Sequence, residues 1–263
     1  MGAGGIDFAV LRKDSSLRRE RDCAVTWSIV AHDPHRETFA VAVTTCNLAV
    51  GASCPFVRAG VGAVSTQSFT NRYLGPAVLD GIGAGLHPAA AIEQALAGDD
   101  GRELRQVHAV DRQGRVAAWT GRHCVAWAGH SGAPHVSFAG NMLSGPAVLQ
   151  DTEAAFAVHG GLSLPRRLVQ ALMAGEAAGG DRRGRQSAAL VMVSTEDFPD
   201  LDLRVDDHVE PLPELRRLLG LWERQREPGL AEAPRRADPA GLTDLDTIEA
   251  RWIERGLDLR FPR

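Results

Sequence analysis

The sequence is poor in lysine, in aromatic side chains and in cysteine pairs. Lys13 is the only lysine among 263 residues, so a phosphate-binding loop of the GxxxxGK type cannot be completed. Four cysteines stand singly with no CxxC pair, which is typical of reduced core residues in a cytoplasmic protein and disfavours a zinc knuckle. A net charge of -4 supplies no basic field for nucleic acid or acidic lipid.

Long apolar runs are missing as well. No stretch approaches the roughly 20 residues that a membrane-spanning helix needs. The N-terminal segment lacks a continuous apolar stretch with a small-residue cleavage site, so we expect no secretion signal. The hydrophobic fraction of 44% and the charged fraction of 24% are those of a globular protein. We therefore expect a cytoplasmic protein that binds neither membranes nor nucleic acid.

The pattern that organises the chain begins at Thr26. Residues 26–33 are rich in apolar and β-branched side chains, which is typical of a buried strand. Residues 32–35, His-Asp-Pro-His, predict a turn, because proline fixes its own φ and keeps the preceding residue out of the helical region. Residues 38–45 alternate in polarity, and we expect them to return as the hairpin partner.

Thr26 is either an ordinary strand threonine or a nucleophile. A threonine hydroxyl needs a neighbouring base, and a free α-amino group on the same residue, with a pKa of about 8, is one such base. Residues 1–25 differ from the rest, with glycines at the start and a charge run over residues 13–21. Val25 is what a GTG start codon yields when translation begins upstream. We hypothesise that the working protein begins at Thr26, after initiator removal or self-cleavage.

The remaining elements follow in the order helix pair, hairpin, helix pair, strands. We predict strands at 60–67, 104–111, 115–120, 135–139, 187–194 and 201–207. We predict helices at 75–82, 88–97, 144–158 (capped by Ser144), 164–174, 213–226 and 243–255. Residues 48–57 and 121–134 show no regular pattern. This order favours an α+β fold of two antiparallel sheets with helices on their outer faces.

The chain divides by composition into three parts. Residues 1–25 are an N-terminal extension, residues 26–210 are the predicted main domain, and residues 211–263 are a helical C-terminal segment. A linker rich in proline, alanine and charge lies near residues 227–239. The apolar face of the helix predicted at 213–226 could serve a homo-oligomer interface.

Five stretches carry a resemblance to a known family. They are TWSIVA at 26–31, GVGAVSTQ at 60–67, Gly140-Asn141, GGDRRGRQSAAL at 179–190 and RVDDH at 204–208. Over residues 26–219 the chain resembles the domain of unknown function 1028 family, which is grouped with the N-terminal-nucleophile (Ntn) hydrolases. The resemblance implies the four-layer αββα sandwich of that superfamily. Family members typically begin at the threonine or one residue before it, so residues 1–25 depart from the pattern.

The resemblance, together with the positions of polar residues, suggests a site. Thr26 is the predicted nucleophile, and Asn141, which follows a glycine at a strand end, is a predicted oxyanion donor. Predicted substrate-binding groups are Gln67, Asn71, Asp181, Arg183 and Gln186. The alternative interpretation of Asp181 and Arg183 is a structural ion pair that fixes the loop. Proteasome-like relatives use a lysine near the threonine to shape its ionisation. Since no lysine follows Lys13, that role is either empty or taken by an arginine such as Arg58 or Arg183, which cannot act as a base.

The expected activity is hydrolysis of a small amide or peptide-like substrate, without a cofactor or a metal. A metal-dependent hydrolase is one alternative, built on His123, His130 and His135 or on Asp206, Asp207 and His208. Neither set has the spacing of a known zinc site such as HExxH. A second alternative, from another class, is a non-catalytic binding or scaffold protein that kept the fold and lost the nucleophile.

Overall fold

The structure of the chain, a computed structural model, describes residues 26–256, so the predicted extension at 1–25 lies outside the described residues. The predicted α+β class is confirmed, with one antiparallel sheet of six strands and a second of four. The described range contains six α-helices. None of the helices in this range is long and apolar enough to cross a membrane.

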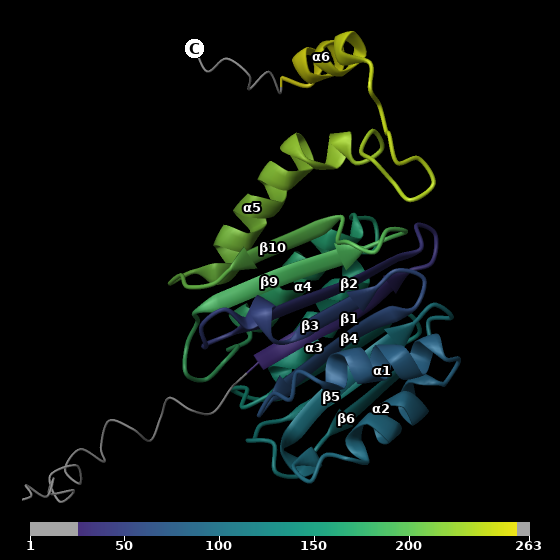
Figure 1. Cartoon of the computed structure of the whole chain (residues 1–263). Coiled ribbons are helices and arrows are strands. Elements are labelled where there is room, and N and C mark those ends of the chain that lie inside the picture. Colours follow the sequence, from purple (N-terminus) through teal and green to yellow (C-terminus); the bar gives the residue numbers. More distant parts are fainter. Residues whose placement is uncertain (1–25, 257–263) are drawn as a thin grey trace, which may run out of the picture.

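The six-stranded sheet carries β1 in its interior (Figure 1). The strand order is β10-β9-β2-β1-β8-β7, and each neighbouring pair is antiparallel. The strands are β1 (Thr26–Asp33), β2 (Thr38–Thr45), β7 (Gly129–Ala133), β8 (Val136–Asn141), β9 (Ser187–Val193) and β10 (Leu201–Val205). The predicted hairpin is confirmed, because Asp33 pairs with Thr38 across a turn at residues 34–37.

The four-stranded sheet has the order β3-β4-β5-β6, and its outer face is covered by α1 and α2 (Figure 1). Its strands are β3 (Pro55–Arg58), β4 (Gly62–Ser68), β5 (Arg105–Asp111) and β6 (Val116–Thr120). The six helices are α1 (Leu74–Gly83), α2 (Pro88–Leu96), α3 (Ala147–Val158), α4 (Leu164–Ala177), α5 (Pro211–Gln225) and α6 (Leu245–Glu254).

Alternation along β1 divides its side chains between two cores. Trp27, Ile29 and Ala31 join a buried cluster with residues of α3, α4 and α5. Val30 points the other way and packs with Ala63 and Val110 of the second sheet. Because successive side chains of a strand alternate between faces, Thr26 and Ser28 lie on the same face as Val30, toward the second sheet.

Helix α5 packs into the cluster on the six-stranded sheet and lies beside β10 (Figure 1). Its buried residues include Leu215 and Leu219, which are 0% and 2% exposed. Residues 230–244, which follow it, contain no helix or strand. The last helix of the described range, α6, lies beyond α5, away from the two sheets (Figure 1).

Two strands arise where the sequence shows no pattern. Strand β3 begins at Pro55 on a sheet edge, a place where the missing N–H of proline is tolerated. Strand β7, with the sequence GHSGA, has no β-branched residue and is held by backbone pairing to β8 at the other sheet's edge. The predicted Ser144 cap is wrong, because α3 begins at Ala147 with Pro146 in the capping position.

Truncation of Leu215 tests whether α5 is part of the core. We expect Leu215→Ala to lower the free energy of unfolding by about 2–5 kcal/mol, because the side chain is fully buried. Arg216→Ala, on the exposed side of the same helix, should change it by no more than about 0.5 kcal/mol. Urea unfolding of the full chain measures both values. Equal stability of the two variants would contradict the packing.

Candidate functional site

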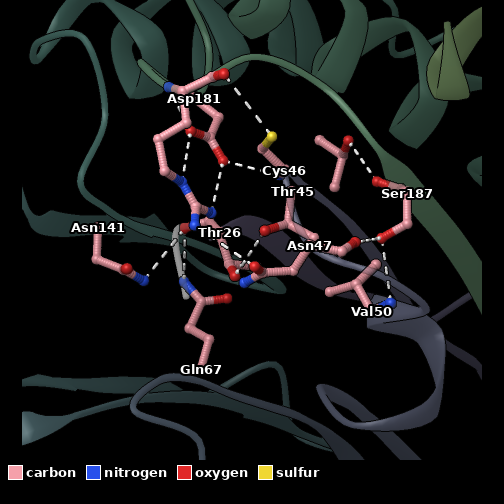
Figure 2. Close-up of polar contacts among 11 residues, drawn as sticks. Thr26, Thr45, Cys46, Asn47, Val50, Gln67, Asn141, Asp181 and Ser187 are labelled. Carbon is pink, nitrogen blue, oxygen red and sulfur yellow. Dashed lines mark hydrogen bonds and ion pairs between the residues drawn. The ribbon is translucent and has the colours of Figure 1, made fainter. Parts of the chain in front are cut away.

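Thr26 is the first residue of β1 and is 2% exposed. It lies opposite Asn141 of β8 in the sheet register. Its Oγ1 lies 3.4 Å from Oγ1 of Thr45, at the end of β2. Figure 2 shows Thr45, Gln67, Asn141 and Asp181 around Thr26. The structure thus brings four of the predicted site residues, Thr26, Gln67, Asn141 and Asp181, to one end of the sheet.

Two side-chain amides hold the backbone of Thr26, and a third links them to each other. Gln67 Nε2 and Asn141 Nδ2 each donate to the Thr26 carbonyl at 3.3 Å. The same two groups donate to Gln106 Oε1, at 2.8 and 3.0 Å. Gln106 Nε2 in turn donates to the Gly140 carbonyl at 2.8 Å. Amide groups from both sheets therefore fix the start of β1.

One polar atom in this arrangement has no partner. Asn141 Oδ1 is buried and accepts no hydrogen bond from the described residues. The neighbours fix the orientation of the Asn141 amide. Both the Thr26 carbonyl and Gln106 Oε1 are acceptors, so the NH₂ group must face them and Oδ1 must face away. A buried acceptor without a donor is uncommon and costs free energy, so it marks a place for a further donor.

A second part of the cluster surrounds His108 of β5. Ser28 Oγ lies 2.7 Å from His108 Nε2 and donates to Gln67 Oε1 at 2.7 Å. His108 Nδ1 lies 3.1 Å from Ser137 Oγ. Burial, with a smaller contribution from His130, lowers the pKa of His108 from 6.5 to about 3. The ring is therefore neutral at pH 7.

Asp181 and Arg183 form an ion pair. Arg183 Nη2 lies 3.2 Å from Asp181 Oδ2, and the Asp181 side chain is fully buried. Asp181 also accepts the backbone N–H groups of Cys46 and Arg183, each at 2.8 Å. Arg183 Nη1 donates to Asn47 Oδ1 at 3.4 Å. The glycine-rich segment at residues 179–184 is thereby held against the end of β2, close to Thr26 (Figure 2).

The other predicted residues have partners elsewhere. Asn71 Nδ2 donates to Asp99 at 2.8 Å, and hydrogen bonds from Arg105 and Asn71 lower the pKa of Asp99 to about 2. Gln186 Nε2 donates to Asp207, although its backbone N–H donates to the Thr45 carbonyl. Arg58 pairs with Asp80 of α1. Within the described part of the chain, no hydrogen bond joins the side chains of these residues to Thr26.

The histidine and aspartate sets do not converge into a metal centre. Over residues 26–256, no group of three or more histidine, cysteine, aspartate or glutamate side chains has an arrangement that holds a metal ion. His130 bonds to Thr120, and His135 bonds to His32. Asp206 pairs with Arg204, and His208 accepts the N–H of Glu210.

Several residues of the cluster escaped the sequence analysis. Gln106, His108 and Ser28 are the main ones, together with Ser65 and Ser137. The signal was present as polar residues at alternate positions within otherwise apolar strands, such as Gln106 and His108 in β5. Such residues share one face of a strand, and several strands with this feature indicate a common polar layer.

These observations define a class: an α+β protein in which two antiparallel sheets enclose a buried polar cluster beside a strand-initial threonine. The chain belongs to the family of unknown function (DUF1028), whose family model matches residues 26–215. Among solved structures, protein SPO2555 from Silicibacter pomeroyi, a member of the same family, is similar at 31% identity with a TM-score of 0.77. The similarity covers 84% of this chain and 96% of that one. No curated protein matches the chain.

The buried neutral His108 predicts a loss of stability in acid. Its pKa in the folded protein, about 3, lies below the ordinary value of 6.5, so between these values the unfolded chain binds a proton that the folded chain does not. Stability therefore falls as the pH drops from 6.5 toward 3, by at most about 1.4 kcal/mol per pH unit.

Replacement of the imidazole by an amide removes this dependence. We expect His108→Gln to lose less stability than the wild type between about pH 7 and pH 5, by roughly 1–2 kcal/mol. Urea unfolding at both pH values measures the difference. His32 and His130, whose pKa values burial also lowers, are present in both proteins and cancel in the comparison. Parallel losses in the two proteins would show that His108 does not titrate in this way.

Proposed function

We propose that the chain is an Ntn-type amidohydrolase that uses Thr26 as its nucleophile. The fold proposal that goes with it is the four-layer αββα sandwich of that superfamily. The buried clusters support this layering: one joins α1 and α2 to the four-stranded sheet, and another joins α3, α4 and α5 to the six-stranded sheet. A third joins the two sheets to each other.

The observation that carries the proposal is the location of Thr26. It begins an interior strand, it faces the second sheet, and side-chain amides from both sheets hold its carbonyl. The family match also begins at residue 26. A nucleophile acts well only when its position is fixed before the substrate arrives, and these hydrogen bonds fix the backbone of Thr26.

The chemistry follows for a chain that begins at Thr26. The α-amine takes the proton of the hydroxyl, directly or through one water, while Oγ1 attacks the substrate carbonyl. The C–N bond breaks, the amine of Thr26 gives the proton to the leaving nitrogen, and an acyl ester remains on Oγ1. Water then attacks that ester by the same route in reverse and releases the acid.

Asn141 has a different part in this scheme from the one that its sequence position suggests. Its N–H group donates to Thr26 and Gln106, so the group left over is the acceptor Oδ1. We assign this oxygen to the new α-ammonium of Thr26, which would supply the donor that the buried atom lacks. Arg183 and Gln186 stay predicted substrate contacts, and the substrate class stays a small amide or peptide.

The test is a chain expressed to begin at Thr26, compared with one that keeps residues 1–25. We expect only the shorter chain to form a covalent adduct with a β-lactone, seen as an intact-mass shift that maps to Thr26. Thr26→Ala should abolish the adduct and lower amide hydrolysis by at least about 10³-fold. Thr26→Ser, which keeps a hydroxyl, should retain both.

The controls separate this proposal from a scaffold that kept the fold. Circular dichroism and urea unfolding must show that Thr26→Ala folds like the parent chain, since among residues 26–256 the Thr26 hydroxyl makes only the long contact to Thr45. A folded chain with a free Thr26 amine that forms no adduct and cleaves no amide in a dipeptide panel would contradict the nucleophile. The non-catalytic alternative would then be favoured.

A further inference from the structure

A cavity lies at the opposite end of the six-stranded sheet from Thr26. A cavity of about 460 Å³ is bounded by the turns after β1 and β7 and by the facing ends of α3 and α4. Thr26 pairs with Asn141, whereas Ala31 pairs with Val136, so the cavity lies at the other end of β1 from Thr26. His32, which lines it, is six residues from Thr26, or about 20 Å along an extended strand.

The walls of the cavity are largely apolar. Phe138 of β8 and Phe156 of α3 form part of its lining, with ring centroids 5.6 Å apart in an edge-to-face contact. Leu162, which also lines the cavity, is 39% exposed. A concave site of this size with apolar walls and a few polar groups is the usual form of a small-ligand site.

Arg167 is the one arginine or lysine among the described residues that line the cavity. Its guanidinium carbon lies 3.6 Å from the centroid of the Phe156 ring, and its Nε donates to the Phe156 carbonyl. Among residues 26–256 it forms no ion pair, in contrast to its neighbour Arg166, which pairs with Glu223. Burial lowers the pKa of Arg167 and the charge of Asp33 acts in the opposite direction, so the guanidinium is partly removed from water and lies within the field of that carboxylate.

The stacked geometry leaves part of the guanidinium for a ligand. The Nε–H caps the last turn of α3, which is a structural role for that one group. The two Nη atoms make no hydrogen bond to the described residues. Paired N–H groups on the rigid plane of a guanidinium match the two oxygens of a carboxylate.

The carboxylates that line the cavity limit the class of ligand that it can bind. Asp33 and Glu153 line the same cavity, and both are held by the protein. Asp33 accepts the N–H of His35, and Glu153 accepts the hydroxyl of Ser131. Their negative charges disfavour a dianion such as phosphate but leave room for a single carboxylate at Arg167. The apolar walls favour a branched aliphatic or aromatic body on that acid.

We propose that this cavity is a second ligand site, distinct from the Thr26 site, which binds a small apolar carboxylic acid through Arg167. The probe is 4-methylpentanoate, and its matched control is 4-methylpentanamide, which has the same body without the charge. Isothermal titration calorimetry on the full chain measures both. We expect the acid to bind at least about 10-fold tighter than the amide, the size expected of a charge-assisted hydrogen bond, and we expect inorganic phosphate to bind more weakly than the acid.

Two arginine variants test the assignment. Arg167→Gln keeps a donor for the Phe156 carbonyl but removes the charge, so the preference for the acid should disappear. Arg166→Gln, one residue away and outside the cavity lining, should leave it unchanged. Equal binding of acid and amide by the wild type, survival of the preference in a folded Arg167→Gln, or the absence of binding by any probe at millimolar concentration would overturn the proposal.

Two further variants cover the other outcomes. If Arg167→Gln does not fold, Leu162→Asp serves in its place. It puts a negative charge, like that of the ligand, at an exposed point of the lining, and it should weaken binding of the acid at least about 10-fold. Undiminished binding of the acid by a folded Leu162→Asp would also overturn the proposal. Thr26→Ala should bind the acid as the wild type does, because the two sites lie at opposite ends of β1. Loss of binding in Thr26→Ala alone would place the acid at the Thr26 site instead.

Discussion

The arrangement of the whole protein depends on keeping buried polar groups hydrogen-bonded between two sheets. A serine from β1, a serine and a glutamine from β4, and a glutamine and a histidine from β5 meet there without access to water. Each would cost roughly 1–3 kcal/mol if left unpaired. The sheets can therefore approach only in the register that pairs these groups, and this requirement fixes one sheet against the other.

The same interface changes character along β1. Near Thr26 and Ser28 it is polar, whereas at Val30 it becomes apolar and packs Phe39, Ala63 and Val110 together. Apolar packing supplies free energy but tolerates small shifts, while a hydrogen-bond network demands fixed geometry. The polar end is thus the rigid end. A threonine held there has the fixed backbone that a nucleophile needs, and the orphaned oxygen of Asn141 leaves one position in the network to be filled.

The sequence predicts the fold better than the site. Strands such as β1 and β9, rich in β-branched residues, and helices with a clear apolar face are recognisable from local pattern alone. Strands β3 and β7 are not, because they owe their conformation to the backbone of a neighbouring strand. Thr26, Gln67 and Asn141, which the sequence analysis names, lie together, but Gln106 and His108 were missed. Their role depends on facing strands from another part of the chain, which no single stretch of sequence reveals.

The two ends of β1 also differ in what the described residues leave unpaired. Beside Thr26 the unpaired group is a buried acceptor, Asn141 Oδ1, which suits an N–H donor. At the far end it is a cation on an aromatic wall, suited to an anion with an apolar body. The other atoms of both side chains have structural partners, but Asn141 Oδ1 and the two Nη atoms of Arg167 have none among the described residues. Groups that stability alone does not account for are the ones to which binding or chemistry is most reasonably assigned, and these two lie near opposite ends of β1.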